Sequence, residues 1–120
     1  MQVVLIAIAG AAGALSRYGI GSAVGPRSFP WGTLGINLAG AFALGLVLRV
    51  AMLRDWPQAV TLPVAIGFLG AFTTFSTFSV ETVDLLRADR APEAAAYVSV
   101  SVLGGLAAAA LGYVAGRVLA

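Results

Sequence analysis

The sequence predicts an all-α membrane protein with four transmembrane helices, of which the third is interrupted. Of its 120 residues, 60% are hydrophobic and only 10% are charged, and the mean hydropathy is +0.97. Soluble domains are nearer a quarter charged. Apolar runs of about twenty residues recur, each long enough to cross a hydrocarbon core of roughly 30 Å. One of these runs also contains six hydroxyl side chains between residues 73 and 82.

Polar and proline-containing segments between the apolar runs set the expected boundaries. Two prolines in the segment 25–30 cannot continue a helix, so this segment is expected to form a turn. Trp31 and Trp56 flank the second run, where indoles favour the membrane interface. A short charged loop follows the third run. The four spans are expected at residues 2–24, 32–53, 62–86 and 94–119, and residues 1–120 are expected to form a single four-span membrane domain.

The third run contains the stretch GFLGAFTTFSTFSVET at residues 67–82, which is unusual for a helix that faces lipid. Hydroxyl residues are interleaved with phenylalanines, after two glycines three residues apart. Irregular backbone survives at membrane depth only where protein buries it or where it lines a polar cavity. We therefore expect an interrupted helix that builds an ion site, with the turn over residues 70–73.

The arginines are spread almost evenly over the two ends of the predicted bundle. One end has Arg49, Arg54 and Arg117, and the other has Arg27, Arg87 and Arg90, with Arg17 nearby. Because the two ends carry nearly equal numbers of arginines, the positive-inside rule predicts no clear preference for either orientation. Insertion in both orientations, and hence an antiparallel dual-topology homodimer, is as compatible with this charge pattern as a single orientation. The arginines form no basic stripe, so nucleic acid is not an expected partner.

The residue types present argue against an enzyme. The chain has no histidine, cysteine or lysine, and its five acidic residues lie in or near loops. No nucleophile with a suitably spaced base is recognisable within a span. A small proton-coupled multidrug exporter with four spans is the alternative function. That class requires a carboxylate well inside the first span, where this chain is purely apolar from residue 3 to residue 15.

Several polar and aromatic side chains inside the spans are suited to an anion. Asn37 lies in the second span, where its NH₂ group could donate to an anion or to another helix. Phe75 and Phe78 share a helical face beside Ser76 and Ser79. Aromatic rims carry partial positive charge, so ring edges and hydroxyls together could replace hydration of an anion. Tyr97 and Ser101, one turn apart on the fourth span, could extend the line of hydroxyls.

The interruption of the third span also suggests a cation site. Breaking a membrane helix frees carbonyl groups, and unwound carbonyls in transporters commonly hold Na⁺. Two subunits meeting antiparallel at this point would supply four such oxygens. A glycine kink whose carbonyls are satisfied by the hydroxyls of Thr73 or Thr74 is the other interpretation.

At these residues the sequence resembles the Fluc (CrcB) family of bacterial fluoride channels. The likeness covers the whole chain and rests on GALSRYG at 13–19, GTLGINLAGAFALG at 32–45 and the stretch at 67–82. The resemblance implies an antiparallel, dual-topology homodimer in the bacterial inner membrane. It also implies two separate pores and passive export of cytoplasmic F⁻ down its electrochemical gradient, which would protect the cell from fluoride toxicity.

The resemblance also assigns roles to individual residues. The expected fluoride pathway comprises Asn37, Phe75, Ser76, Thr77, Phe78, Ser79, Tyr97 and Ser101. Arg17 is expected at a pore vestibule, and the backbone carbonyls of Gly70 and Thr73 are expected to hold a structural Na⁺ at the dimer centre. Gly105 departs from the family pattern, because relatives commonly have a small hydroxyl residue there.

Overall fold

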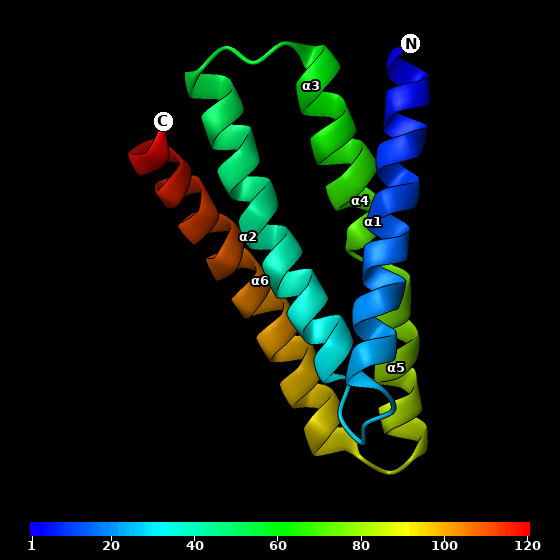
Figure 1. Cartoon of the computed structure of the whole chain (residues 1–120). Coiled ribbons are helices and arrows are strands. Elements are labelled where there is room, and N and C mark those ends of the chain that lie inside the picture. The colour runs from blue at the N-terminus through cyan, green and yellow to red at the C-terminus, as the bar shows by residue number, and fades with distance from the viewer.

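The computed structural model describes residues 1–120 and is entirely helical, with four apolar segments long enough to span a membrane (Figure 1). Its elements are α1 (Gln2–Val24), α2 (Trp31–Leu53), α3 (Gln58–Leu62), the π-helix η1 (Pro63–Leu69), α4 (Gly70–Phe72), α5 (Phe75–Arg87) and α6 (Ala91–Leu119). The segments from α3 to α5 together form the third span, Gln58–Arg87. The prediction of four spans with an interrupted third is confirmed.

Two spans begin earlier than the sequence suggested, in each case ahead of a proline. The fourth begins at Ala91 rather than at residue 94, because Pro92 lies in its first turn, where proline is tolerated. The third begins at Gln58 rather than at residue 62, although Pro63 follows. Pro63 is the first residue of η1, whose wider π-helical turn lets the chain continue past the proline.

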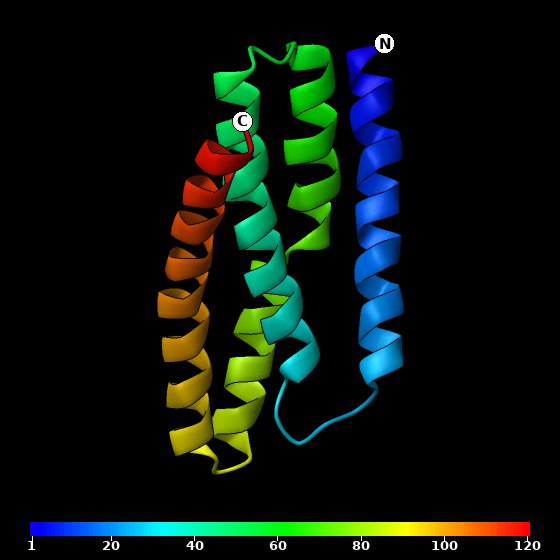
Figure 2. The same cartoon turned by 60° about the vertical axis from the view of Figure 1, so that its left-hand side comes forward.

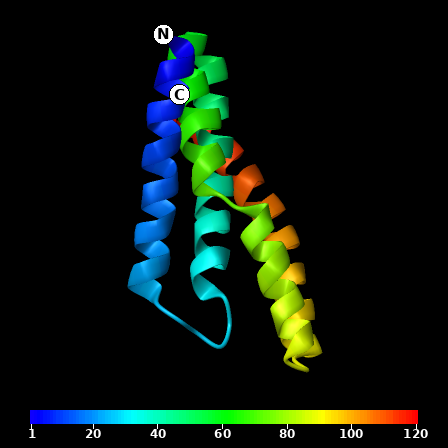
Figure 3. The same cartoon turned by 90° about the vertical axis from the view of Figure 1, so that its right-hand side faces the viewer.

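The break in the third span lies later than predicted. Gly70 keeps helical torsion angles, φ −64° and ψ −36°. The extended residues are Thr73, with φ −81° and ψ 156°, and Thr74, with φ −148° and ψ 114°. Thr74 is the N-cap of α5, and its hydroxyl accepts a hydrogen bond from the backbone N–H of Thr77. The break is therefore fixed by this threonine cap and not by glycine flexibility. Figure 3 shows α5 tilting away from the line of the first half of the span.

Glycines allow the helices to approach closely within one chain. α2 and α6 run side by side in the same direction (Figure 2), and a Cβ on Gly112 would collide with the carbonyl of Phe42. A Cβ on Gly13 of α1 would likewise collide with the carbonyl of Phe68 in η1. In lipid, such close backbone packing replaces the hydrophobic drive for helices to associate.

The outer surface of the bundle is apolar. Only 14 of 120 residues are buried, none of them polar or charged, and large side chains such as Val118 are 80% exposed. Exposed apolar surface on this scale is suited to lipid or to a second protein chain. The main buried cluster lies beside α5 and comprises Leu34, Leu85, Ala94 and Tyr97.

Candidate functional site

Asn37 bridges the break in the third span. Its Nδ2 donates to the carbonyl of Thr74 at 3.1 Å, and its Oδ1 accepts from the N–H of Thr74 at 2.8 Å. The side-chain amide thus replaces two backbone bonds that an unbroken helix would make. One of the two Nδ2 hydrogens has no partner within the chain, so Asn37 both holds the break together and keeps one donor for a ligand.

The hydroxyls after the break form a connected group. The Thr74 hydroxyl lies 3.1 Å from that of Thr77 and 3.2 Å from that of Ser76. The Ser79 hydroxyl donates to the carbonyl of Phe75 at 2.9 Å. Because a hydroxyl has one hydrogen, Ser79 must rotate before it can donate to an anion. Ser76 is exposed, and its hydroxyl can either donate to or accept from Thr74.

The two phenylalanines lie together, as the sequence predicted. The ring centroids of Phe75 and Phe78 are 5.8 Å apart, with the planes tilted by 49°. Phe78 also meets the ring of Tyr97 edge-on, at 5.0 Å and 62°. Phe75 is 79% exposed at the surface of the single chain. Its ring therefore lies on the outer surface of the single chain, where it can face lipid or a second protein chain.

Glu81, about two turns into α5, was expected from the sequence at headgroup level or in a vestibule and was not assigned to the pathway. Oε1 of Glu81 accepts from the Thr33 hydroxyl at 2.7 Å, and Oε2 accepts from the Tyr97 hydroxyl at 2.9 Å. The hydroxyl of the fully buried Tyr97 therefore points to Glu81 and donates its hydrogen there. The spacing of Thr33 and Asn37, one helical turn apart, could have indicated that both face the third span.

The fourth span has a hydroxyl without a partner. The Oγ atom of Ser101 is buried and makes no hydrogen bond within the chain. It lies one turn beyond Tyr97, and the next turn presents Gly105, beside which there is open space. A buried polar atom without a partner is rare in proteins and indicates a place where a ligand, water or another chain can bind.

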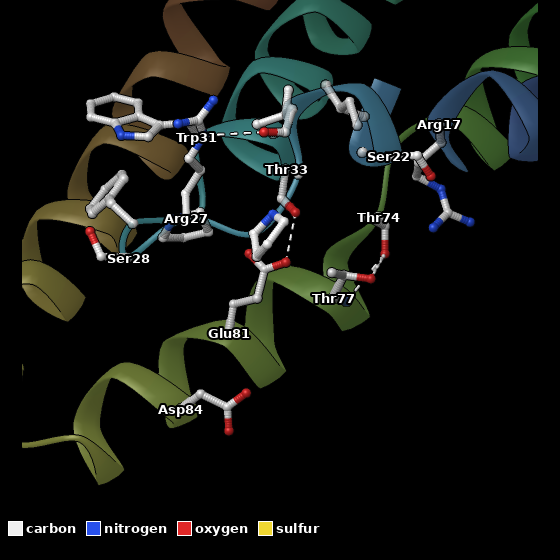
Figure 4. A pocket seen from close by; sticks show the side chains of 18 of the residues that line it. Arg17, Ser22, Arg27, Ser28, Trp31, Thr33, Thr74, Thr77, Glu81 and Asp84 are labelled. Carbon is white, nitrogen blue, oxygen red and sulfur yellow. Dashed lines mark hydrogen bonds between the residues drawn. The ribbon is translucent and has the colours of Figure 1, made fainter. Parts of the chain in front are cut away.

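A large cavity opens next to the break, between the end of α1, the α1–α2 loop and α5 (Figure 4). It has a volume of about 1160 Å³, and its polar lining includes Arg17, Thr33, Thr74, Thr77 and Glu81. Figure 4 shows Arg17 and Thr74 from separate elements close to one another at one side of this cavity.

Arg17, about two turns before the last residue of α1, lines this cavity on the side of the bundle where a vestibule was expected. Its Nε donates to the carbonyl of Ala71 at 3.1 Å, just before the break. The bond fixes the guanidinium beside the broken backbone, and no carboxylate lies within ion-pair distance of it. Arg17 therefore places a positive charge without an ion-pair partner at the break, in a cavity whose lining also includes the carboxylates of Glu81 and Asp84.

Of the residues predicted for the pathway, only Thr77 is among those lining this cavity. Asn37 and Ser76 are one hydrogen bond away from its wall, because both bond to Thr74. The other members of the predicted set lie outside the lining: Phe75, Phe78, Ser79, Tyr97 and Ser101. Hydrogen bonds connect Asn37, Ser76 and Thr77 to Thr74 at the break, and ring contacts connect Phe75, Phe78 and Tyr97 outside the cavity. The hydroxyl of Ser101 makes no hydrogen bond to either group.

The carbonyls predicted to hold a cation have lost their usual donors. In an unbroken helix the N–H of Thr74 would bond to the carbonyl of Gly70, but it donates to Asn37. The N–H of Thr77 would bond to the carbonyl of Thr73, but it donates to the Thr74 hydroxyl. The Thr73 hydroxyl donates to Leu69, so it satisfies neither carbonyl. The carbonyl oxygens of Gly70 and Thr73 therefore have no helical donor at the break.

Comparison with known proteins agrees with this geometry. The family described as "CrcB-like protein, Camphor Resistance (CrcB)" matches residues 4–113. A protein of Bordetella petrii named fluoride-specific ion channel FluC is 41% identical over 120 residues, covering 99% of this chain and 94% of its own. FluC 2 of Symbiobacterium thermophilum is 50% identical over 111 residues, covering 89% and 90%. FluC 1 of Natronomonas pharaonis is 49% identical over 114 residues, covering 94% and 86%. With a four-span bundle, a threonine-capped break and near full-length similarity, this chain belongs to the CrcB family.

Proposed function

We propose that the chain is a fluoride-selective channel through which F⁻ leaves the cytoplasm passively. The observation that carries the proposal is the broken third span, where hydroxyls, ring edges and an arginine without an ion-pair partner gather within one membrane-embedded region. The relatives named fluoride-specific ion channel supply the identity of the ion.

Fluoride selectivity requires donors that replace a tightly held hydration shell. F⁻ is smaller and more strongly hydrated than Cl⁻, so a narrow path must bring donors close to the ion while excluding the larger halide. Arg17 raises the local concentration of anions in the cavity without entering the narrow path. Asn37, Ser76 and Thr77 then offer donors near the break, and the rims of Phe75 and Phe78 supply partial positive charge. Weak, distributed contacts of this kind allow the ion to leave again.

Further hydroxyls would continue the path along the fourth span and α5. Ser101 has a buried oxygen with no partner, and Ser79 can turn from the Phe75 carbonyl toward an ion. The ring of Tyr97 supports Phe78, and its hydroxyl adjoins the path through Glu81.

The functional unit would be an antiparallel homodimer. A single chain leaves Phe75 79% exposed beside the exposed Ser76, and a membrane helix does not present hydroxyls and a polar break to lipid without a partner. A second copy in the opposite orientation would cover this face and complete two equivalent pathways. The even distribution of arginines permits insertion in both orientations in the bacterial inner membrane.

A Na⁺ ion at the centre of this dimer fits the residues present. The carbonyls of Gly70 and Thr73 lack their helical donors, and Gly70 is exposed at the surface where a partner would dock. When bound, Na⁺ would be coordinated by these oxygens and would satisfy their partial negative charge in place of the missing N–H donors. Two chains would provide four oxygens around the two-fold axis.

Purified protein in liposomes loaded with fluoride tests the proposal. Rapid F⁻ loss that needs no proton gradient, followed with a fluoride electrode, is the expected result. Drug movement coupled to protons would instead identify an exporter, and the absence of either transport would indicate a structural membrane subunit.

The exporter alternative has no observation in its favour. The first span contains Arg17 but no carboxylate, and the carboxylate nearest the bundle interior, that of Glu81, accepts hydrogen bonds from Thr33 and Tyr97. A proton-exchanging acid in the first span, which such exporters need, is therefore missing.

A further inference from the structure

A continuous series of aromatic rings connects the α1–α2 loop with the break in the third span. The ring centroids of Trp31 and Phe29 are 4.7 Å apart, and those of Phe29 and Tyr97 are 5.5 Å apart with the planes at 75°. Tyr97 then meets Phe78 at 5.0 Å, and Phe78 meets Phe75 at 5.8 Å. Edge-on contacts at such distances are the favoured arrangement of aromatic pairs.

Tyr97 is the fixed centre of this series. It is the one large side chain with no exposed surface, and its hydroxyl is held by Glu81. Phe29 and Phe78 both pack against its cluster, and each meets the Tyr97 ring in an edge-on contact. Protein interiors are close-packed, so a void beside one ring lets that ring move and frees the next.

The loop that holds Phe29 is itself restrained. Arg90 donates from Nη1 to the carbonyl of Ser28, so the base of α6 is tied to the residue before Phe29. The N–H of Trp31 donates to the carbonyl of Phe29 at 2.8 Å. Pro30 fixes one backbone torsion between these two residues. A ring on such a loop is an effective support because its own position is determined.

We infer that Phe29 is a positioning residue for the ion path, because its ring holds Tyr97 in the place that sets the orientation of Phe78. The inference rests on the proposed function, since it concerns how an aromatic side chain of the proposed pathway is aimed. Phe29 is among the residues that line the wide cavity, but it is outside the proposed narrow path and is not proposed to contact the ion. It acts through the contact between Phe29 and Tyr97 and the contact between Tyr97 and Phe78. Its effect on flux must therefore disappear when the Phe78 ring is absent.

A double-mutant cycle tests this dependence. Fluoride efflux per reconstituted channel is measured for the wild type, Phe29→Leu, Phe78→Ile and the double variant. Phe29→Leu is expected to lower the rate roughly fivefold, the effect of losing one edge-on aromatic pair. In the Phe78→Ile background the same change is expected to alter the rate by less than about 1.5-fold, because coupled residues are non-additive.

Two further variants separate positioning from simple packing. Phe29→Tyr keeps the ring and is expected to restore wild-type flux, whereas Phe29→Met keeps most of the volume without a ring and is expected to behave like Phe29→Leu. Phe68→Leu is the matched control. It removes one ring of a stacked pair outside the series, with centroids 5.9 Å apart, and should leave the rate unchanged.

The outcomes distinguish this inference from the proposed function. If the wild type shows no uncoupled F⁻ efflux, the proposed function fails. If the wild type conducts but Phe29→Leu and Phe29→Met conduct equally well, the positioning role is wrong. The inference would also be wrong if the fold reductions in efflux rate caused by Phe29→Leu and Phe78→Ile multiply in the double variant, because Phe29 would then act independently of Phe78. Should Phe29→Leu not yield folded protein, Phe29→Met and Phe29→Tyr provide the same comparison.

Discussion

At the scale of single residues, Phe75 and Phe78 have different surroundings although they are one turn apart. Phe78 packs edge-on against the ring of Tyr97, whereas Phe75 is largely exposed in the single chain. The two rings are therefore expected to differ in rigidity within one chain.

Replacing either ring with an aliphatic side chain tests the aromatic path. Phe75→Ile and Phe78→Ile remove the positive ring edge while keeping an apolar side chain, and each is expected to cut fluoride efflux from liposomes by roughly fivefold or more. Wild-type flux in both variants would rule out a role for the ring edges.

Asn37→Asp is expected to abolish fluoride flux for two reasons, which the variant Asn37→Ala can separate. The new carboxylate repels the permeant anion, and it can no longer donate to the carbonyl of Thr74. Asn37→Ala is the comparison, since it loses the bonds to Thr74 without adding charge. Efflux from the Asp variant should be at least ~10-fold below that of the Ala variant. Equal rates would show that the charge itself has no effect.

At the scale of elements, the α2–α6 pair depends on backbone approach at specific glycines. Gly112→Ala places a methyl group against the Phe42 carbonyl and is expected to destabilise the fold by about 1–3 kcal/mol. Gly105→Ala, on the same helix, meets nothing within 4 Å and should be neutral. The fraction of folded protein after heating in detergent provides the measurement. Equal loss in both variants would contradict the close-packing argument.

The sequence predicted the features that depend on residues close together along the chain, but not those that depend on contacts between helices. Span number and the existence of a break depend on local hydropathy and composition, so both were predicted. The turn was expected over residues 70–73, but the break falls at Thr73 and Thr74 and is set by the Thr74 cap and by Asn37, which is 37 residues from Thr74 along the chain. The cap itself is a local bond to Thr77, but the contact with Asn37 comes from another helix, and the sequence alone could not place that contact.

The carboxylate of Glu81 illustrates the same limit within the candidate site. From the sequence it belongs toward the end of the third span, where a headgroup-level or a vestibule role was expected. In the structure three helices meet at it, with Thr33 from α2 and Tyr97 from α6 donating to its two oxygens. Only the mutual placement of these helices brings the three side chains together.

At the scale of the whole molecule, the proposed orientation of the two copies can be observed directly. A tag on the C-terminus is expected to be accessible from both sides of the membrane in one population of cells, because the arginine balance favours neither orientation. Labelling with a membrane-impermeant reagent, before and after permeabilisation, measures the two fractions. A tag that is labelled from one side only would require a different dimer.

The positions of the two chain ends also limit how two antiparallel copies could be joined into one polypeptide. Both lie at the same end of the bundle, since the chain crosses an even number of times (Figure 1). A short peptide joining two copies in tandem would force them to point the same way. A single polypeptide containing an antiparallel pair would therefore need one additional transmembrane helix between its two halves. A fusion with a soluble linker should not form a functional channel.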